Sequence, residues 1–354
     1  MDIIRTLQLV KQSFGKGIIL LLIIVSFIAS CSDSQKSEVK EFIPYTIENV
    51  KVAPKAEGIS VKSLYYAPKV GEKSSYKLVQ ISKVERNSVQ MEQSITQYYT
   101  KSIISIKPDS SIEMSLKIDS MRISEKGPDQ AQPGKIVSLQ FNSEDSASKN
   151  KPEYKQYYAI VGSQVQILAS KLGRIEEIIG LTPIINQILG SKKDSVPDKL
   201  KENLAQQIKT QFFQLPLQQE FQTYPETGKL DASKKWSRID VLPMSGILTV
   251  KNTVNYTMGS IKEMNGKKVA IVDANLTAEI SKSKEMPKGL QFTLNDSKFE
   301  GKGITIVDVQ TGSTLYKKNE VFTMISATMK ELASGIIQAV SQKIQTTVTV
   351  ELLH

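Results

Sequence analysis

The chain has 354 residues, of which 40% are hydrophobic and 23% are charged, and its formal net charge is +10. This composition is ordinary for a soluble protein with a real core. It contains one histidine, His354 at the last position, and one cysteine, Cys31. These counts exclude a His-based catalytic triad, a His/Cys metal cluster and a cysteine nucleophile in the folded part, and they leave no disulfide within it.

The first thirty residues have the layout of an export signal. Arg5, Lys11 and Lys16 form a basic leader, and an apolar run of twelve residues follows at 18–29. A helix that crosses a membrane needs about 20 apolar residues, so this run is too short to span. We therefore predict a signal peptide over residues 1–30.

The residues that end this signal are Ile28, Ala29, Ser30 and Cys31. They resemble the lipobox of bacterial lipoproteins, and the resemblance implies cleavage before Cys31 and acylation of its thiol. Two or more acyl chains anchor a protein stably, so the implied partner is a membrane surface. The alternatives are an ordinary secretory signal with a chance cysteine and a short uncleaved anchor helix. Without the signal, which holds three basic residues and one acid, the net charge is +8.

The rest of the chain divides by composition. Residues 31–60 begin with a polar stretch, and we interpret them as a lipidated tether. We predict a strand-rich envelope domain over 61–354. Its two parts, 61–175 and 225–354, are loosely alike and would be joined by helices over 175–215.

Alternating apolar and polar residues predict the strands. The pattern is clearest from Ile112 and slips near Asp119-Ser120, which indicates a bulge. A second alternation surrounds Asn265-Gly266, the favoured pair of a type I′ hairpin turn. The last strand covers 348–352. The segment 321–344 is ambiguous between helix and strand, and we favour strand because Gly335 would interrupt a helix.

The middle of the chain has helical spacing instead. Isoleucines recur at helical intervals over 175–188, and Ser195-Val196-Pro197-Asp198 is typical of a capping box. Apolar residues then recur every fourth position over 200–212, and Leu215-Pro216 is expected to end that helix. Strands, then helices, then strands predict an α+β fold, mostly antiparallel, whose sheet curls into a half-barrel over the helices.

A wider resemblance rests on short motifs in a fixed order. They are Gly71-Glu72-Lys73 with Tyr76, residues 157–162, residues 171–175, Gly228 with Trp236, Gly301-Lys302-Gly303, Asp308 and Thr311-Gly312. Spanning about residues 65–352, they resemble a family of uncharacterised exported proteins common in Bacteroidota. The resemblance implies a strand-rich envelope domain, and it carries over no catalytic or binding residue.

Few residues point to chemistry. No Walker loop or dinucleotide fingerprint is present, and Gly301-Lys302-Gly303 is interpreted as a turn. Carboxylate pairs for glycoside hydrolysis remain, but we read Glu176-Glu177 as a solvated helix face and place Asp296 and Glu300 in a loop. Trp236 is expected in the core. We predict no catalytic residue, no metal site and no cofactor.

The function classes that remain are binding and assembly. Lysine pairs at Lys192-Lys193, Lys234-Lys235, Lys267-Lys268 and Lys317-Lys318 are interpreted as solvated turns, and the alternative is attraction to anionic lipid or glycan surfaces. Nucleic acid is excluded as a partner for an exported chain. The leading hypothesis is a non-enzymatic lipoprotein of the cell envelope, at the outer membrane, that binds an apolar or amphipathic ligand. The alternatives are a structural subunit that docks with an envelope protein and a carboxylate-based hydrolase.

Overall fold

The computed structural model describes residues 42–128, 136–149, 151–244, 248–282 and 289–353. The predicted signal and lipobox, with Ile28, Ala29, Ser30 and Cys31, fall outside these residues. The predicted fold class is confirmed: the chain forms a mostly antiparallel sheet with a helical segment in the middle, and the sheet does not close into a barrel.

The strands are β1 (Lys73–Arg86), β2 (Val89–Ile106), β3 (Ile112–Pro128), β4 (Ile136–Asn142), β5 (Gln164–Ala169), β6 (Ile175–Ile179), β7 (Lys235–Met244), β8 (Leu248–Met264), β9 (Lys267–Lys282), β10 (Leu290–Asp308), β11 (Thr314–Glu331) and β12 (Ile337–Leu353). The α-helices are α2 (Ile47–Val52), α3 (Lys155–Ile160), α4 (Thr182–Leu189), α5 (Asp198–Ile208) and α6 (Leu215–Phe221). Short 3₁₀ turns are η1 (Ser146–Ser148), η2 (Pro152–Tyr154) and η3 (Gly190–Lys192), and a π-helical turn η4 (Lys209–Gln214) joins α5 to α6.

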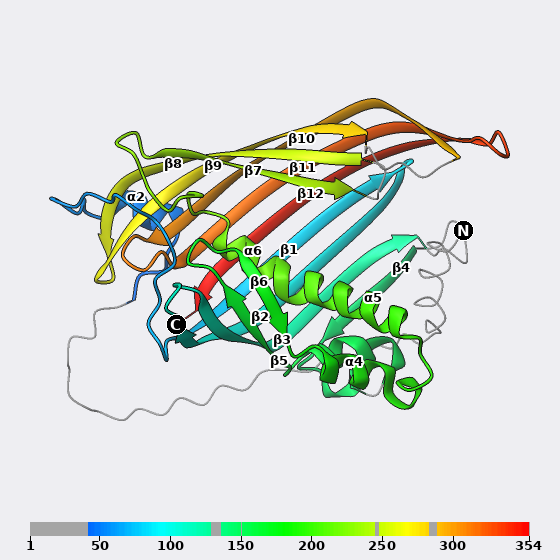
Figure 1. The fold of residues 1–354 in the computed structure, drawn as a ribbon, viewed down its shortest axis with the longest axis horizontal. Helices are drawn as coiled ribbons and strands as arrows, with labels where there is room; N and C mark the ends of the chain where they lie inside the picture. The colour runs from blue at the N-terminus through cyan, green and yellow to red at the C-terminus, as the bar shows by residue number, and fades with distance from the viewer. Residues whose placement is uncertain (1–41, 129–135, 150, 245–247, 283–288, 354) are drawn as a thin grey trace, which may run out of the picture.

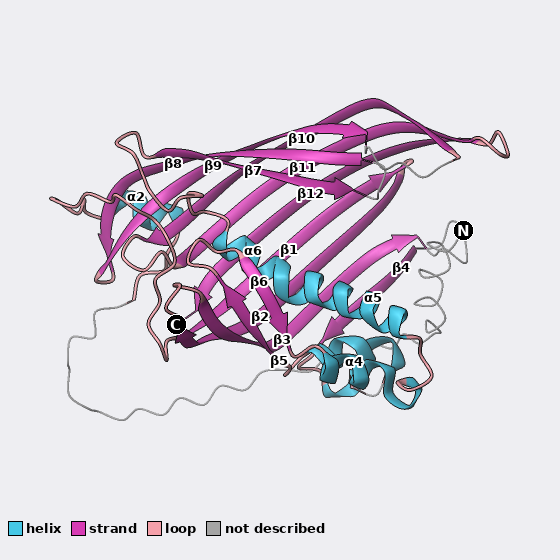
Figure 2. Cartoon of the chain, viewed as in Figure 1, coloured by secondary structure: helices cyan, strands magenta, loops and turns pink. Residues whose placement is uncertain are grey.

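One continuous sheet contains all the described strands, in the order β6-β5-β3-β2-β1-β12-β11-β10-β9-β8-β7, with β4 paired to β3. The first long strand, β1, pairs with the last, β12, so the first and last strands of the sheet lie side by side in its middle. The sheet curves around the α5–η4–α6 rod, which lies along its concave face (Figure 1; Figure 2). Hydrogen bonds reach this rod from β2 and from β8, far apart in the strand order, which requires the curvature.

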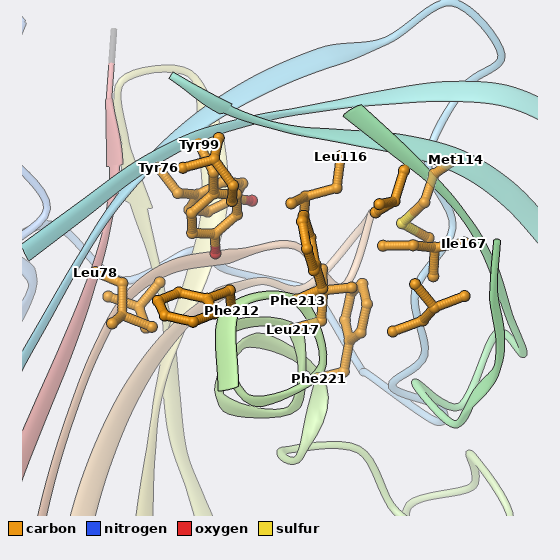
Figure 3. Packing of buried hydrophobic residues seen from close by; sticks show 14 of the residues in the cluster. Tyr76, Leu78, Tyr99, Met114, Leu116, Ile167, Phe212, Phe213, Leu217 and Phe221 are labelled. Atoms are coloured by element: carbon orange, nitrogen blue, oxygen red, sulfur yellow. The ribbon is translucent and has the colours of Figure 1, made fainter. Parts of the chain in front are cut away.

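The core forms where the rod meets the sheet. Phe212, Phe213, Leu217 and Phe221 point from the rod toward Tyr76, Leu78, Tyr99, Met114, Leu116 and Ile167 of the strands (Figure 3). All of these side chains are buried. Burying one such side chain contributes about 1.5–3 kcal/mol, so this contact fixes the rod inside the sheet.

Several local predictions are confirmed. Asp119 is the extra residue of a bulge, since Tyr98 pairs with Ser120 and Tyr99 with Ile118. Asn265 and Gly266 both have positive φ in the turn between β8 and β9, as a type I′ turn requires. The ambiguous segment 321–344 lies in β11 and β12, as strand.

Three local predictions are wrong. The first residues of the expected helical segment 175–215 form strand β6, because a short apolar run fits a buried strand as well as a helix. The proline at 216 does not end the helix. It stands in the first turn of α6, where the π-helical turn has already interrupted the hydrogen-bond ladder. The expected capping box is absent, since Pro197 precedes α5 and no side chain caps it.

Gly312 sits at the turn between β10 and β11, with φ of +70°, in van der Waals contact with the chain at Tyr65. A Cβ built on Gly312 would lie 2.0 Å from the Tyr65 carbonyl oxygen. The turn also accepts a 2.8 Å hydrogen bond from the buried Tyr224 hydroxyl to the Gly312 carbonyl. Only glycine lets the segment 64–67 approach this closely, and that segment brings Tyr66 into the core.

Gly312→Ala is expected to lower the free energy of unfolding by more than the roughly 1–2 kcal/mol that a left-handed alanine costs, because the backbone must also move apart. Gly58→Ala is the matched control, since Gly58 has the same φ of +70° and nothing within 4 Å of its built Cβ. Urea unfolding of both variants measures the difference. Equal losses would contradict the steric account.

Candidate functional site

A buried ion pair fixes α6 to the sheet. Lys101 of β2 donates to the Glu220 carboxylate of α6, and the two side chains are 1% and 0% exposed. The second carboxylate oxygen of Glu220 accepts a 3.4 Å hydrogen bond from the Tyr99 hydroxyl. Buried charges are tolerated when they are paired and hydrogen-bonded, and this pair meets both conditions.

Aromatic rings enclose the ammonium group of Lys101. Its Nζ lies 4.6 Å from the ring centroid of Tyr66, 5.1 Å from that of Tyr76 and 4.9 Å from that of Phe221. Burial, followed by the Glu220 charge, raises the pKa of the Tyr66 and Tyr76 hydroxyls well above its usual value. The ring faces stabilise the cation, so the pair is a structural clamp closed off from solvent.

Glu220→Gln is expected to cost about 3–5 kcal/mol of unfolding free energy, because it leaves the charge of Lys101 buried without its counter-ion. The control is Glu320→Gln, which breaks the half-exposed ion pair of Glu320 with Lys318 and should cost less than about 1 kcal/mol. Chemical denaturation of both variants tests the contrast. Similar losses for the two would show that the buried pair does not hold α6.

Beside the clamp, a cavity of about 510 Å³ lies between α6 and the inward face of strands β7 to β12. Its volume is within the range of ligand-binding cavities in proteins. Two glycines of β10, Gly301 and Gly303, also line it, and neighbouring side chains lie close over them: a Cβ on Gly301 would meet Val321 and Leu276, and a Cβ on Gly303 would meet the Asn319 amide. The sequence prediction of a turn at 301–303 is wrong, since these residues pair with β9 on one side and β11 on the other.

Apolar and polar side chains both line the cavity. The apolar side chains are Val254, Tyr256, Leu276, Phe299, Val321 and Val348. Polar groups come from Arg238, whose Nη1 donates to the Gln222 carbonyl at 3.4 Å, and from Asn319, whose amide donates to Gln219 at 2.9 Å. The Asn252 Oδ1 is buried and has no hydrogen-bond partner within the described part of the chain.

Lys317 of β11 is the unusual residue of this cavity. Its side chain is 4% exposed, and among the described residues it has no hydrogen-bond or ion-pair partner. Burial, followed by the nearby Arg238 charge, lowers the pKa of Lys317 to about 7, and the Glu220 charge opposes the shift. Keeping a buried lysine charged costs free energy when no anionic group pairs with it. The site therefore lacks a negative charge that would stabilise the protonated Lys317.

The sequence prediction for this residue was wrong. The sequence predicts a solvated turn at Lys317-Lys318, whereas both residues lie in β11 and only Lys318 faces outward to pair with Glu320. The sequence pattern of this strand does predict that Lys317 faces inward. Val321, Thr323 and Ala327 mark the positions whose side chains face inward. Counting back in steps of two reaches Lys317.

Lys317 gives the protein a specific pH dependence. Between the folded pKa of about 7 and the unfolded value near 10.5, the unfolded state holds a proton that the folded state lacks. Stability therefore rises with pH in this window, by about 2 kcal/mol from pH 7 to pH 9. Lys317→Met removes this rise. Urea unfolding at both pH values measures it, and parallel pH curves for the two proteins would contradict the assignment.

The other sequence-predicted residues do not line the cavity. Glu176 and Glu177 are exposed as expected but lie on strand β6 and not on a helix. Asp296 and Glu300 are exposed on strand β10, so their prediction as loop residues is wrong. Trp236 stacks on Tyr256 with ring centroids 5.3 Å apart and packs against the core, as expected. Of the described residues, no group of three His, Cys, Asp or Glu side chains could hold a metal ion. No helix in the described part is long and apolar enough to span a bilayer.

Comparison with known proteins identifies a family and little else. A family model described as a family of unknown function, DUF6263, matches residues 109–314, from just before β3 to the start of β11. No curated protein matches. The solved structures of OccK7 (OpdD) from Pseudomonas aeruginosa and of a DUF1329 family protein from Desulfovibrio piger are 8% and 7% identical, with TM-scores of 0.20 and 0.13. Each alignment covers 80% of this chain, with 98% and 86% of the respective structure. No inference about ligand or activity follows from similarity this low.

Proposed function

This chain belongs to the DUF6263 family, whose function is unknown, and we propose from its cavity that it is a non-enzymatic binding protein for an amphipathic ligand. The prediction of an uncharacterised family agrees with this membership. We further propose that Cys31 carries acyl chains that anchor the protein at the cell envelope, on the outer membrane. The support for the anchor is the sequence 28–31 and the basic, apolar leader before it.

The observation that carries the binding proposal is the combination of an apolar wall and an unpaired buried lysine in one cavity. Val254, Leu276 and Val321 offer apolar surface, and Lys317 offers a positive charge at its inner end. A purely structural core would fill the space or pair the charge. A ligand with both an apolar and a polar part satisfies both features.

A hydrolase is less well supported by the same geometry. Glycoside hydrolysis needs two carboxylates that flank the scissile bond. Among the described residues that line the cavity, Asp240 is the one with a carboxylate. The binding proposal therefore needs no bond-breaking step.

Docking to an envelope protein is the second candidate function. Strand β7 forms an edge of the sheet, and its outward side chains Ile239 and Val241 are 53% and 61% exposed. An edge strand offers unpaired backbone groups to a partner strand, and apolar side chains add contact area. This candidate places the partner at the edge, whereas the first places the ligand inside.

Native mass spectrometry of the full-length protein, extracted from host membranes in detergent, tests these proposals together. We expect a chain that begins at Cys31 with added acyl mass and carries a small ligand. Leu276→Trp, which fills the cavity, should lose the ligand, and Thr277→Trp on the opposite face of β9 should keep it. A protein partner in place of a ligand would favour docking, and a ligand retained by Leu276→Trp would contradict the cavity. A different first residue, or Cys31 without acyl mass, would contradict the anchor.

A further inference from the structure

The strand register places Lys317 at the closed end of the cavity. In β10 and β12 its direct neighbours are Thr305 and Val350, and Val272 of β9 faces Thr305. All three neighbours are buried, at 2%, 1% and 0% exposure. Thr223, just after α6, lies 3.3 Å from the Thr305 hydroxyl, so the chain around α6 covers this end. A group that reaches Lys317 must enter from the other end.

An apolar row lies between Lys317 and the opening. Moving along the strands away from Lys317, the next inward row holds Gly303 and Asn319, and the row after it joins Val254, Leu276, Gly301 and Val321 across four strands. Arg238 of β7 extends this second row, because it pairs with Val254. Gly301 and the three apolar side chains of this row are partly exposed, whereas the direct neighbours of Lys317 are buried, so the apolar surface lies on the side where a ligand enters.

The charged groups around Lys317 leave its charge without a counter-ion. Glu220 of α6 is engaged on one oxygen by Lys101 and on the other by Tyr99. Arg238 of β7 adds a second positive charge near Lys317. Asp240 lies two residues further along β7, in register with Asn252, which places it toward the opening.

We propose that the ligand of this cavity is an anionic amphiphile that enters head-first, with its acidic head group paired to Lys317 and its apolar chain along Val254, Leu276 and Val321. This inference rests on the proposed binding function and specifies its ligand class. The acidic head group supplies the negative charge that the inner end lacks, and Arg238 strengthens the attraction. The chain removes the partly exposed apolar row from water.

Binding of a matched pair of probes, dodecanoate and dodecanol, to the full-length protein at pH 6.5 tests the head group, because the two share the same twelve-carbon skeleton and differ in having an anionic carboxylate or a neutral hydroxyl. Wild-type protein should bind dodecanoate at least tenfold more tightly than dodecanol. Lys317→Met should lose that preference and keep dodecanol binding. Lys318→Met is the control, since Lys318 is the next residue on the outer face, and it should bind like wild type.

The outcomes separate the two proposals. Equal affinity for both probes in wild-type protein, or an unchanged preference in Lys317→Met, overturns the anionic ligand and leaves the binding function standing. Binding of neither probe overturns the binding function, and the anionic ligand with it. Acetate is a further probe, because it has the carboxylate without the apolar chain. If acetate displaces dodecanoate at equal concentration, the apolar row contributes nothing to the affinity, and the proposal of an amphipathic ligand is wrong.

A second measurement uses wild-type protein alone, so its result does not depend on whether a variant folds. Lys317 is mostly neutral at pH 8, and a bound anion should restore its charge, so binding should take up about 0.9 proton per site. The Tyr256 hydroxyl, with its pKa at about 12, stays neutral at this pH. Titration calorimetry of dodecanoate in two buffers of different ionisation enthalpy measures the uptake. No uptake would contradict the pairing with Lys317.

Discussion

The ion pair between Lys101 and Glu220 is the contact on which the rest of the structure depends. It joins β2 to α6, aromatic rings enclose it, and it holds α6 against the concave face of the sheet. The position of α6 then determines what lies beneath it, because the helix covers the end of the cavity where Lys317 lies. The Glu220 carboxylate is bound by Lys101 and Tyr99, so it is not available to pair with Lys317.

The cavity lies between α6 and the inward face of strands β7 to β12. Gly301 and Gly303 of β10 let neighbouring residues approach the strand closely, because a Cβ at either position would meet atoms of Leu276, Asn319 or Val321. A core under selection for stability alone would fill this space. The unfilled cavity and the unpaired Lys317 are two local departures from good packing, and they occur in the same place, which is the pattern expected of a functional site.

Much of the fold could be predicted from the sequence, because its strands alternate cleanly and its turns use specific residues. The bulge at Asp119 and the turn at Asn265-Gly266 are local features that a few residues determine. The cavity could not be predicted, since it depends on how a curled sheet brings β7 and β11 around α6. The burial of Lys317 follows from the alternation of inward and outward residues along β11. A pair of lysines is more often part of a solvated turn, so the local composition favours the wrong prediction.

The protonation of Lys317 is the most direct test of this account. Carbon-13 NMR of the lysine side chains follows the ε-carbon of each lysine with pH, and Lys317→Met assigns the signal. We predict that the Lys317 signal titrates near pH 7 in the ligand-free protein. Saturation with dodecanoate should move that titration above pH 9. A signal that titrates near 10.5 without ligand, or one that ligand leaves unchanged, would contradict it.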